Sequence, residues 1–83
     1  MPNEKNLKKV SGGVPQSPIL IAAERHGRRS KQFYSACKKA GLSPNEITWE
    51  ILDEVAKQTD AINKRTYITP EDYSFLKQWN IPF

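Results

Sequence analysis

The sequence predicts a mainly α-helical protein, a small domain of three to four helices with a flexible N-terminal arm. A hydroxyl residue followed by proline, which is typical of a helix start, occurs three times. Apolar residues after these pairs recur at helical spacing, and no two segments alternate as neighbouring strands of a sheet do. With 83 residues the chain forms one small domain at most, with a thin margin of stability.

The helical domain is predicted to cover residues 17–83, and residues 1–16 are predicted to form the flexible basic arm. Nearly all aromatic and branched side chains lie in the later stretch. A segment with little apolar surface to bury gains too little to offset the entropy lost on ordering. The boundary is therefore placed between residues 16 and 17.

The three helix-start pairs are Ser17-Pro18, Ser43-Pro44 and Thr69-Pro70. In each pair the hydroxyl can accept a hydrogen bond from a free backbone N–H, and proline suits the first helical position, where no N–H is needed. We expect helices over residues 18 to about 25, 31 to 40, 44 to about 59 and 70 to about 79. Ser30 is the expected cap of the second helix, and Gly41 is its expected stop. Residues 63–68 are expected to form a loop or one short extended strand.

The same three pairs lie 26 residues apart, twice. An ungapped alignment of residues 17–42 with residues 43–68 also pairs isoleucine, glutamate and lysine positions, which is consistent with an internal duplication. The alternative is that the matches are residues common on any exposed helix. The predicted helix starts hold under either interpretation.

The predicted helices each carry an apolar face. On the second helix this face is Phe33, Ala36, Cys37 and Ala40. On the third it is Ile47, Ile51, Leu52, Val55 and Ala56. On the fourth it is Phe75, Leu76 and Trp79. Burying about a dozen such side chains, at roughly 1.5–3 kcal/mol each, offsets the ordering entropy of a small body with little to spare.

The net charge of +4 is unevenly distributed. Residues 1–39 hold nine Lys or Arg against two acids, and residues 40–83 hold four against seven. Such asymmetry is a recognised hint of an acidic or polyanionic partner. The alternative is ordinary uneven charge on the solvated surface of a small protein.

The sequence holds no catalytic constellation, so we predict a non-enzymatic protein with no cofactor, no metal site and no small-molecule substrate. His26, the one histidine, lies among cations and has no partner to orient it as a general base. Cys37, the one cysteine, lies on an apolar helix face and is interpreted as a core residue rather than a nucleophile. One histidine and one cysteine cannot complete a structural zinc site.

The favoured interpretation is a small regulatory or binding protein whose basic segment, residues 25–39, contacts nucleic acid or an acidic protein surface. The candidate binding residues are Arg25, Arg28, Arg29, Lys31, Tyr34, Lys38, Lys39 and Trp49. Lys and Arg that contact phosphates release counterions, so such binding weakens steeply with salt.

A partial helix-turn-helix outline is present, because Cys37, Gly41, Ser43 and Ile47 match the packing of two helices across a tight turn. In that motif the second helix enters the major groove of DNA. Here the second helix would carry four acids and one lysine, which phosphates repel. We therefore expect residues 25–39, rather than this helix, to contact any nucleic acid.

A protein partner is the other binding hypothesis, with the basic segment on an acidic patch. Trp49 falls at the edge of the third helix's apolar face, where we expect it to be half exposed, and Trp and Arg are frequent interface anchors. Trp79 shares a face with Phe75 and Leu76. The alternative is that both tryptophans complete the core.

Residues 7–13, LKKVSGG, resemble the end of a double-glycine leader of bacteriocin-type exported peptides. The resemblance implies that a transporter-protease cuts after Gly13, the second residue of the pair Gly12-Gly13, and that Leu7 and Val10 dock the leader as a short amphipathic helix. The leader would have 13 residues, fewer than is usual for that family, and Asn6 stands where an acidic residue is common. The alternative is a basic tail that ends in a glycine hinge.

The sequence predicts a cytoplasmic protein, or a secreted one if residues 1–13 are a leader. No apolar run approaches the roughly 18 residues of a membrane span, and the N-terminus lacks the apolar stretch of a general secretory signal. A single cysteine excludes an internal disulfide. The oligomeric state is left open.

Overall fold

The computed structural model describes residues 13–83, which are mainly helical and contain no strand. The helices are α1 (Pro18–His26), α2 (Lys31–Lys39), α3 (Trp49–Asn63) and α4 (Pro70–Gln78), with a 3₁₀ turn, η2 (Pro44–Glu46), before α3. The predicted fold class is therefore confirmed. Residues 64–69, between α3 and α4, form a loop without strand structure.

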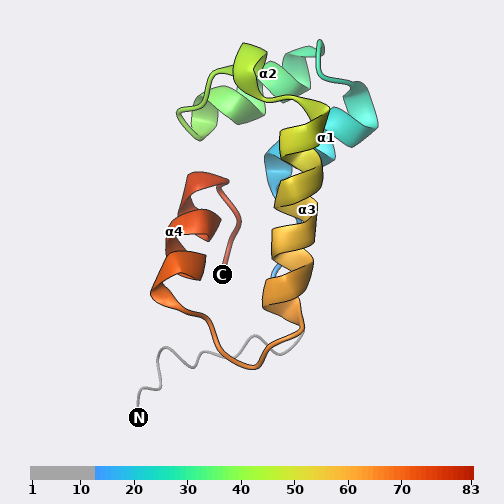
Figure 1. Cartoon of the computed structure of the whole chain (residues 1–83). Helices are drawn as coiled ribbons and strands as arrows, with labels where there is room; N and C mark the ends of the chain where they lie inside the picture. The colour runs from blue at the N-terminus through green and yellow to red at the C-terminus, as the bar shows by residue number, and fades with distance from the viewer. Residues whose placement is uncertain (1–12) are drawn as a thin grey trace.

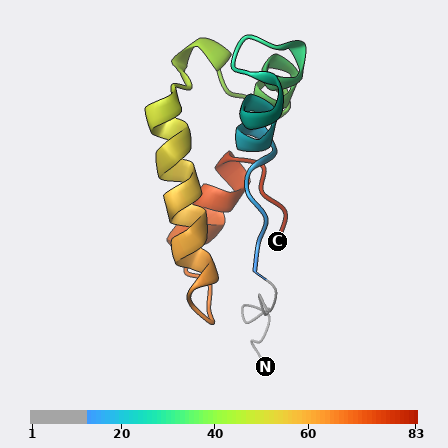
Figure 2. The ribbon, with the colours of Figure 1, turned by 90° about the vertical axis from the view of Figure 1, so that its right-hand side faces the viewer.

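The helices α1 and α2 pack against each other at one end of the molecule, and α3 runs away from that end (Figure 1). The helix α4 lies beside α3, and the last residues of the chain turn back between the two helices in this view. The turned view shows the segment before α1 running up along the body, next to the C-terminal residues (Figure 2). Both chain ends that the structure describes therefore contribute to one packed body.

Three of the four predicted helix starts form as expected. The Ser17 hydroxyl oxygen accepts the N–H of Ile19 at 3.1 Å, and that of Ser30 accepts the N–H of Phe33 at 3.1 Å. Thr69 and Asp72 form a reciprocal capping box at the start of α4. At the end of α2, Gly41 adopts a positive φ of 74°, which completes the predicted stop.

The predicted helix start at Ser43 is wrong. The Ser43 side chain makes no cap hydrogen bond, and the backbone after it forms only the 3₁₀ turn before becoming extended at Ile47. The helix begins instead at Trp49, where the Thr48 hydroxyl accepts the N–H of Ile51 at 3.3 Å. Burial of Ile47 and the hydrogen bonds of Arg28 to this stretch hold it outside the helix.

The late start of α3 affects two further predictions. Nine residues, 40–48, separate α2 from α3, so the tight turn of the helix-turn-helix outline does not form. In the 26-residue alignment, the α-helix start that is present after Ser17 is absent after Ser43, although it is present again after Thr69. The matching sequence signals at Ser17, Ser43 and Thr69 thus give unlike local structures.

The core contains most of the predicted apolar residues. Its buried members are Val14, Ile19, Leu20, Ala23, Phe33, Cys37, Ile47, Leu52, Val55, Ile62, Ile68, Leu76, Trp79 and Ile81. The prediction for Ile51 is wrong, because 37 % of its surface is exposed. The buried face of α3 instead includes Thr59, whose hydroxyl donates to the carbonyl of Val55 at 2.8 Å. That bond gives the buried Thr59 hydroxyl a hydrogen-bond partner among apolar side chains.

The packed body begins earlier than the predicted boundary at residue 17. Val14 is only 6 % exposed and belongs to the core. Its N–H donates to Oδ1 of Asn63 at 2.7 Å, and Nδ2 of Asn63 donates to its carbonyl at 3.0 Å. Residues 13–16 are therefore part of the domain, and the remainder of the predicted arm lies outside the described residues.

Candidate functional site

The predicted basic segment spans the end of α1, the turn at residues 27–30, and α2. Five of its cations are exposed, namely Arg25, Arg29, Lys31, Lys38 and Lys39. Within residues 13–83 the ion pair that forms is Arg65 with Asp72, far from this segment in the fold. The acids of α3 thus do not neutralise the basic segment by ion pairing.

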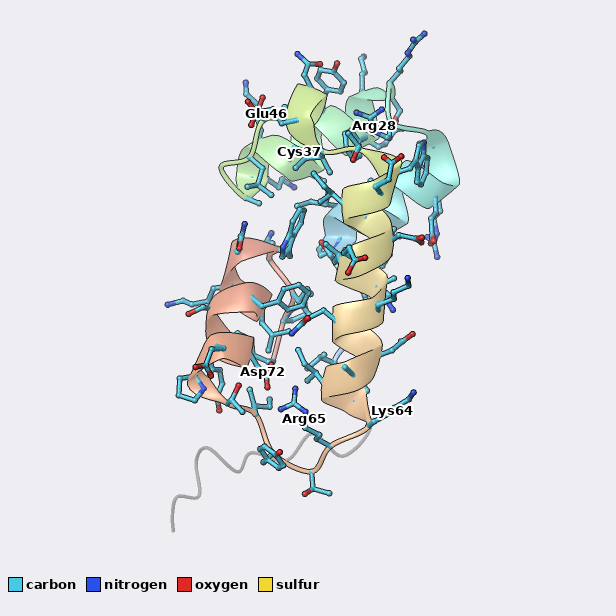
Figure 3. All side chains as sticks on the ribbon, viewed as in Figure 1. Arg28, Cys37, Glu46, Lys64, Arg65 and Asp72 are labelled. Carbon is cyan, nitrogen blue, oxygen red and sulfur yellow. The ribbon has the colours of Figure 1, made fainter. Side chains whose placement is uncertain are left out.

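Arg28 differs from the other cations because its guanidinium is used by the fold. Its Nε donates to the carbonyl of Ile47 at 2.5 Å, and Nη2 donates to the carbonyl of Pro44 at 3.4 Å. The guanidinium also lies 5.9 Å from the ring centroid of Phe33. Arg28 sits where the α1–α2 pair meets the start of α3 (Figure 3). It therefore holds residues 44–48 against α2 and adds positive charge to the surface around it.

Two predicted aromatic residues are exposed near this junction. Trp49, the first residue of α3, is 50 % exposed, in agreement with the prediction that it is half exposed. Tyr34 is 43 % exposed, and its hydroxyl lies 3.3 Å from Oδ1 of Asn45. Trp79 is buried in the core at 6 % exposure. The two tryptophans therefore have different surroundings, and Trp49 alone of the two is available to a partner.

Three shallow depressions follow one another around the α1–α2 pair. The first is lined by His26, Gly27, Arg28, Arg29, Ser30 and Trp49. The next shares His26 with it and adds Arg25 and Gln32 to a mainly apolar lining that includes Ile21 and Pro82. The last shares Gln32 with the second and adds Lys31 and Lys39. We call this continuous surface, from Trp49 through Arg29 and Arg25 to Lys31 and Lys39, the cationic track.

The cationic track contains no carboxylate among its lining residues. The first turn of α2 is also without an acid, and basic residues occupy the last turns of both α1 and α2. The exposed acids of α3, such as Glu50, Asp53 and Glu54, lie on a different helix. Charge of one sign along a continuous surface raises the local concentration of anions.

The structure brings together only part of the predicted set of binding residues. Arg25, Arg28, Arg29, Lys31, Lys39 and Trp49 line the cationic track, whereas Lys38 and Tyr34 do not. Residues 34 and 38 are one helical turn apart, so they are neighbours on α2 beside the edge of the track. His26 and Gln32 join the track without having been predicted. Their role depends on how α1 packs on α2, and no local sequence signal carries that information.

Cys37 is confirmed as a core residue, with no exposed surface. Burial raises the pKa of its thiol, and the nearby positive charge of Arg28 only partly opposes this shift. The thiol is therefore protonated at neutral pH, whereas a nucleophilic cysteine requires the thiolate. Cys37 contributes to packing beneath the track and is closed to a partner.

Gly13, the second glycine of the double-glycine resemblance, has a conformational role in the folded chain. Its φ is +73°, and a Cβ at this position would lie 2.6 Å from Oδ1 of Asn63. A residue without a side chain is thus needed where the backbone passes Asn63. Gly12 and residues 7–11 lie outside the described part of the chain.

Comparison with models of protein families, with curated proteins and with solved structures gives no match. In residues 13–83 no helix is long and apolar enough to cross a bilayer. The same residues hold no group of three or more His, Cys, Asp or Glu side chains placed to bind a metal ion.

Proposed function

We propose that this chain is a small non-enzymatic protein that binds nucleic acid through its cationic track. The observation that supports the proposal is the gathering of exposed cations from α1 and α2 on one continuous surface without a carboxylate. Phosphates are the anions that nucleic acids present at regular, closely spaced intervals. Each contact from a lysine or arginine releases condensed counterions, which supplies free energy without base recognition.

We favour nucleic acid over an acidic protein surface because every charged side chain that lines the track is a cation. Protein interfaces of ordinary size have a buried apolar centre with charges at the rim. On the track, Trp49 is the single large exposed apolar side chain among the lining residues. A chain of phosphates needs no such centre, since charge alone supplies most of the affinity.

The test is the salt dependence of oligonucleotide binding, measured by fluorescence anisotropy. The variant Arg25→Ala/Arg29→Ala/Lys31→Ala removes three track cations and leaves the packed Arg28 in place. The matched control Lys57→Ala/Lys64→Ala/Lys77→Ala removes equal charge from exposed positions outside the track. The logarithm of the affinity falls linearly with the logarithm of the salt concentration. We expect the track variant to make this fall less steep, with the magnitude of the slope smaller by about 2 to 3, because each phosphate contact contributes roughly 0.7–0.9.

The control variant is expected to keep the slope of the unchanged protein. Equal losses in the two variants would mean that net charge, rather than the track, controls binding. Absence of binding at low salt would contradict the proposal. Binding to polyglutamate but not to an oligonucleotide would instead indicate an acidic protein partner.

A further inference from the structure

From the exposed tryptophan beside the cations of the track we infer that its partner is single-stranded nucleic acid, with one base stacked on Trp49. This inference rests on the proposed function and adds to it the strandedness of the partner and a role for the exposed tryptophan. Two separate observations carry it, namely the spread of the track's cations over consecutive parts of the chain and the position of Trp49 beside them.

The cations of the track come from three consecutive parts of the chain, namely the end of α1, the turn at residues 27–30, and α2. Neighbouring depressions share His26 and Gln32, so these cations lie on adjoining parts of the surface and on more than one element. Duplex DNA has a persistence length of about 50 nm and stays straight over so short a distance, so it touches one side of the pair. A single strand bends at each nucleotide and can meet Arg29, Arg25 and Lys31 in turn.

Trp49 provides the stacking surface that single strands use. Its side chain is 50 % exposed and lines the same depression as Arg28 and Arg29. Aromatic side chains beside cations are the usual means of holding unpaired bases, because every base has a π face to stack. In a duplex the bases are already stacked on one another and cannot reach an indole.

Trp49 is also held in place before any partner arrives. Arg28 bonds to the carbonyl of Ile47, and the Thr48 hydroxyl caps the helix that begins with Trp49. The backbone entering the tryptophan is thus fixed on both sides. Such preorganisation lowers the entropy lost on binding.

The competing arrangement places α2 in the major groove of a duplex. The residues that it would use are Lys31, Ser35 and Lys38, which lie along one side of α2 at helical spacing. Lys38 does not line the cationic track, and Trp49 belongs to α3 rather than to α2. The two arrangements therefore depend on different single residues.

The experiment compares the full chain with three variants on two probes, a mixed-sequence single-stranded oligonucleotide and the blunt duplex of the same length. The variants are Trp49→Ala, Trp49→Phe and Lys38→Ala, each at an exposed position, with circular dichroism to verify the fold. We expect the single strand to bind at least tenfold more tightly than the duplex. Trp49→Ala should weaken single-strand binding by about tenfold to a hundredfold, and Trp49→Phe should keep most of it.

Tryptophan fluorescence supplies a second readout. Stacking should quench the emission of Trp49 as the single strand saturates, and the quench should vanish in Trp49→Phe, since the remaining Trp79 is buried. Lys38→Ala should change single-strand binding by less than threefold.

The outcomes separate the inference from the proposed function. Equal affinity for both probes, with a loss in Lys38→Ala and none in Trp49→Ala, would overturn the inference and leave nucleic-acid binding intact. A single-strand preference that is unaffected by Trp49→Ala would overturn the stacking role. Failure of both probes to bind at low salt would overturn the inference together with the proposed function.

Discussion

Asp72 is the one carboxylate within residues 13–83 that is buried, and two hydrogen-bond donors reach its Oδ2. Its Oδ2 accepts Nη1 of Arg65 at 2.6 Å and the backbone N–H of Thr69 at 3.0 Å, and its own N–H donates to the Thr69 hydroxyl at 3.1 Å. Figure 3 shows Arg65 and Asp72 pointing toward each other across the loop before α4. Burial alone would raise the pKa of Asp72, but these hydrogen bonds together hold the pKa below its ordinary value of 3.8.

We expect Asp72→Asn to lower the free energy of unfolding by about 2 kcal/mol at pH 7, because it removes a charge-assisted bond and weakens the capping box. Since the pKa is lower in the folded chain than in the unfolded chain, the ionised carboxylate stabilises the fold above pH 3.8. That stabilisation is lost as the pH falls through the folded pKa. Urea unfolding at pH 7 and at pH 2.5 measures both effects.

The matched control for Asp72 is Asp53→Asn, at an exposed position on α3. It should change stability by less than about 0.5 kcal/mol at either pH. If Asp72→Asn and the unchanged protein lost stability in parallel on acidification, the carboxylate of Asp72 would not be the group responsible.

Gly13 and Gly41 form a second residue-scale comparison, because both have a positive φ and only one is crowded. A Cβ at Gly13 would meet the Asn63 side chain, whereas a Cβ at Gly41 has open space within 4 Å. We expect Gly41→Ala to cost about 1 kcal/mol for the left-handed backbone alone. Gly13→Ala should cost about 1 kcal/mol more, because Asn63 must move and lose its bonds to Val14.

Thermal unfolding of the two alanine variants measures this difference, and hydrogen exchange of the Val14 amide reports on its cause. Exchange at Val14 should accelerate in Gly13→Ala and stay unchanged in Gly41→Ala. Equal costs in the two variants would show that the approach of Gly13 to Asn63 adds nothing to the stability of the body.

At the scale of elements, local sequence signals located α1, α2 and α4 but misplaced the start of α3. The caps at Ser17, Ser30 and Thr69 satisfy backbone groups within three residues, so the sequence nearby contains all the information needed. Ser43-Pro44 carries the same local signal. There, contacts with Arg28 and burial of Ile47 outweigh it, and the helix begins at Trp49.

The two hydroxyl residues before α3 are expected to respond differently to substitution. Thr48→Ala should lower the free energy of unfolding by about 1 kcal/mol, since the Thr48 hydroxyl accepts the N–H of Ile51. Ser43→Ala should change it by less than about 0.3 kcal/mol, because the Ser43 side chain makes no cap bond. Urea unfolding of both variants decides between the two helix starts, and a larger loss for Ser43→Ala would contradict the start at Trp49.

At the scale of the whole molecule, the charge asymmetry of the sequence becomes an asymmetry in space. The cations of residues 25–39 gather around the α1–α2 pair, and the acids of the later residues lie mainly on α3 and α4. Under the proposed function, an approaching nucleic acid would be attracted to the end that carries the α1–α2 pair and repelled along α3. Trp49, at one end of the cationic track, lies where the cationic α1–α2 pair meets the acidic α3. The salt-slope and stacking experiments both test this end of the molecule.

The fold class, three helix starts and most of the core could be predicted from the amino-acid sequence, because these depend on interactions between residues a few positions apart. The sequence also located the cationic segment, since charge follows directly from composition. It did not determine which cations share a surface. Lys38 and Tyr34 belong to the predicted set but lie off the track, and His26 and Gln32 lie on it.

Only the tertiary structure decided the boundary of the body, the start of α3 and the role of Arg28. Asn63 binds Val14 across 49 residues, the Ser17 hydroxyl donates to the carbonyl of Trp79 across 62, and Arg28 binds Ile47 across 19. Contacts between such distant positions form only when the helices pack, so no local sequence pattern predicts them. Where they compete with a local signal, as at Ser43, the packed arrangement prevails because it buries Ile47 and gives Arg28 two backbone carbonyls to bind.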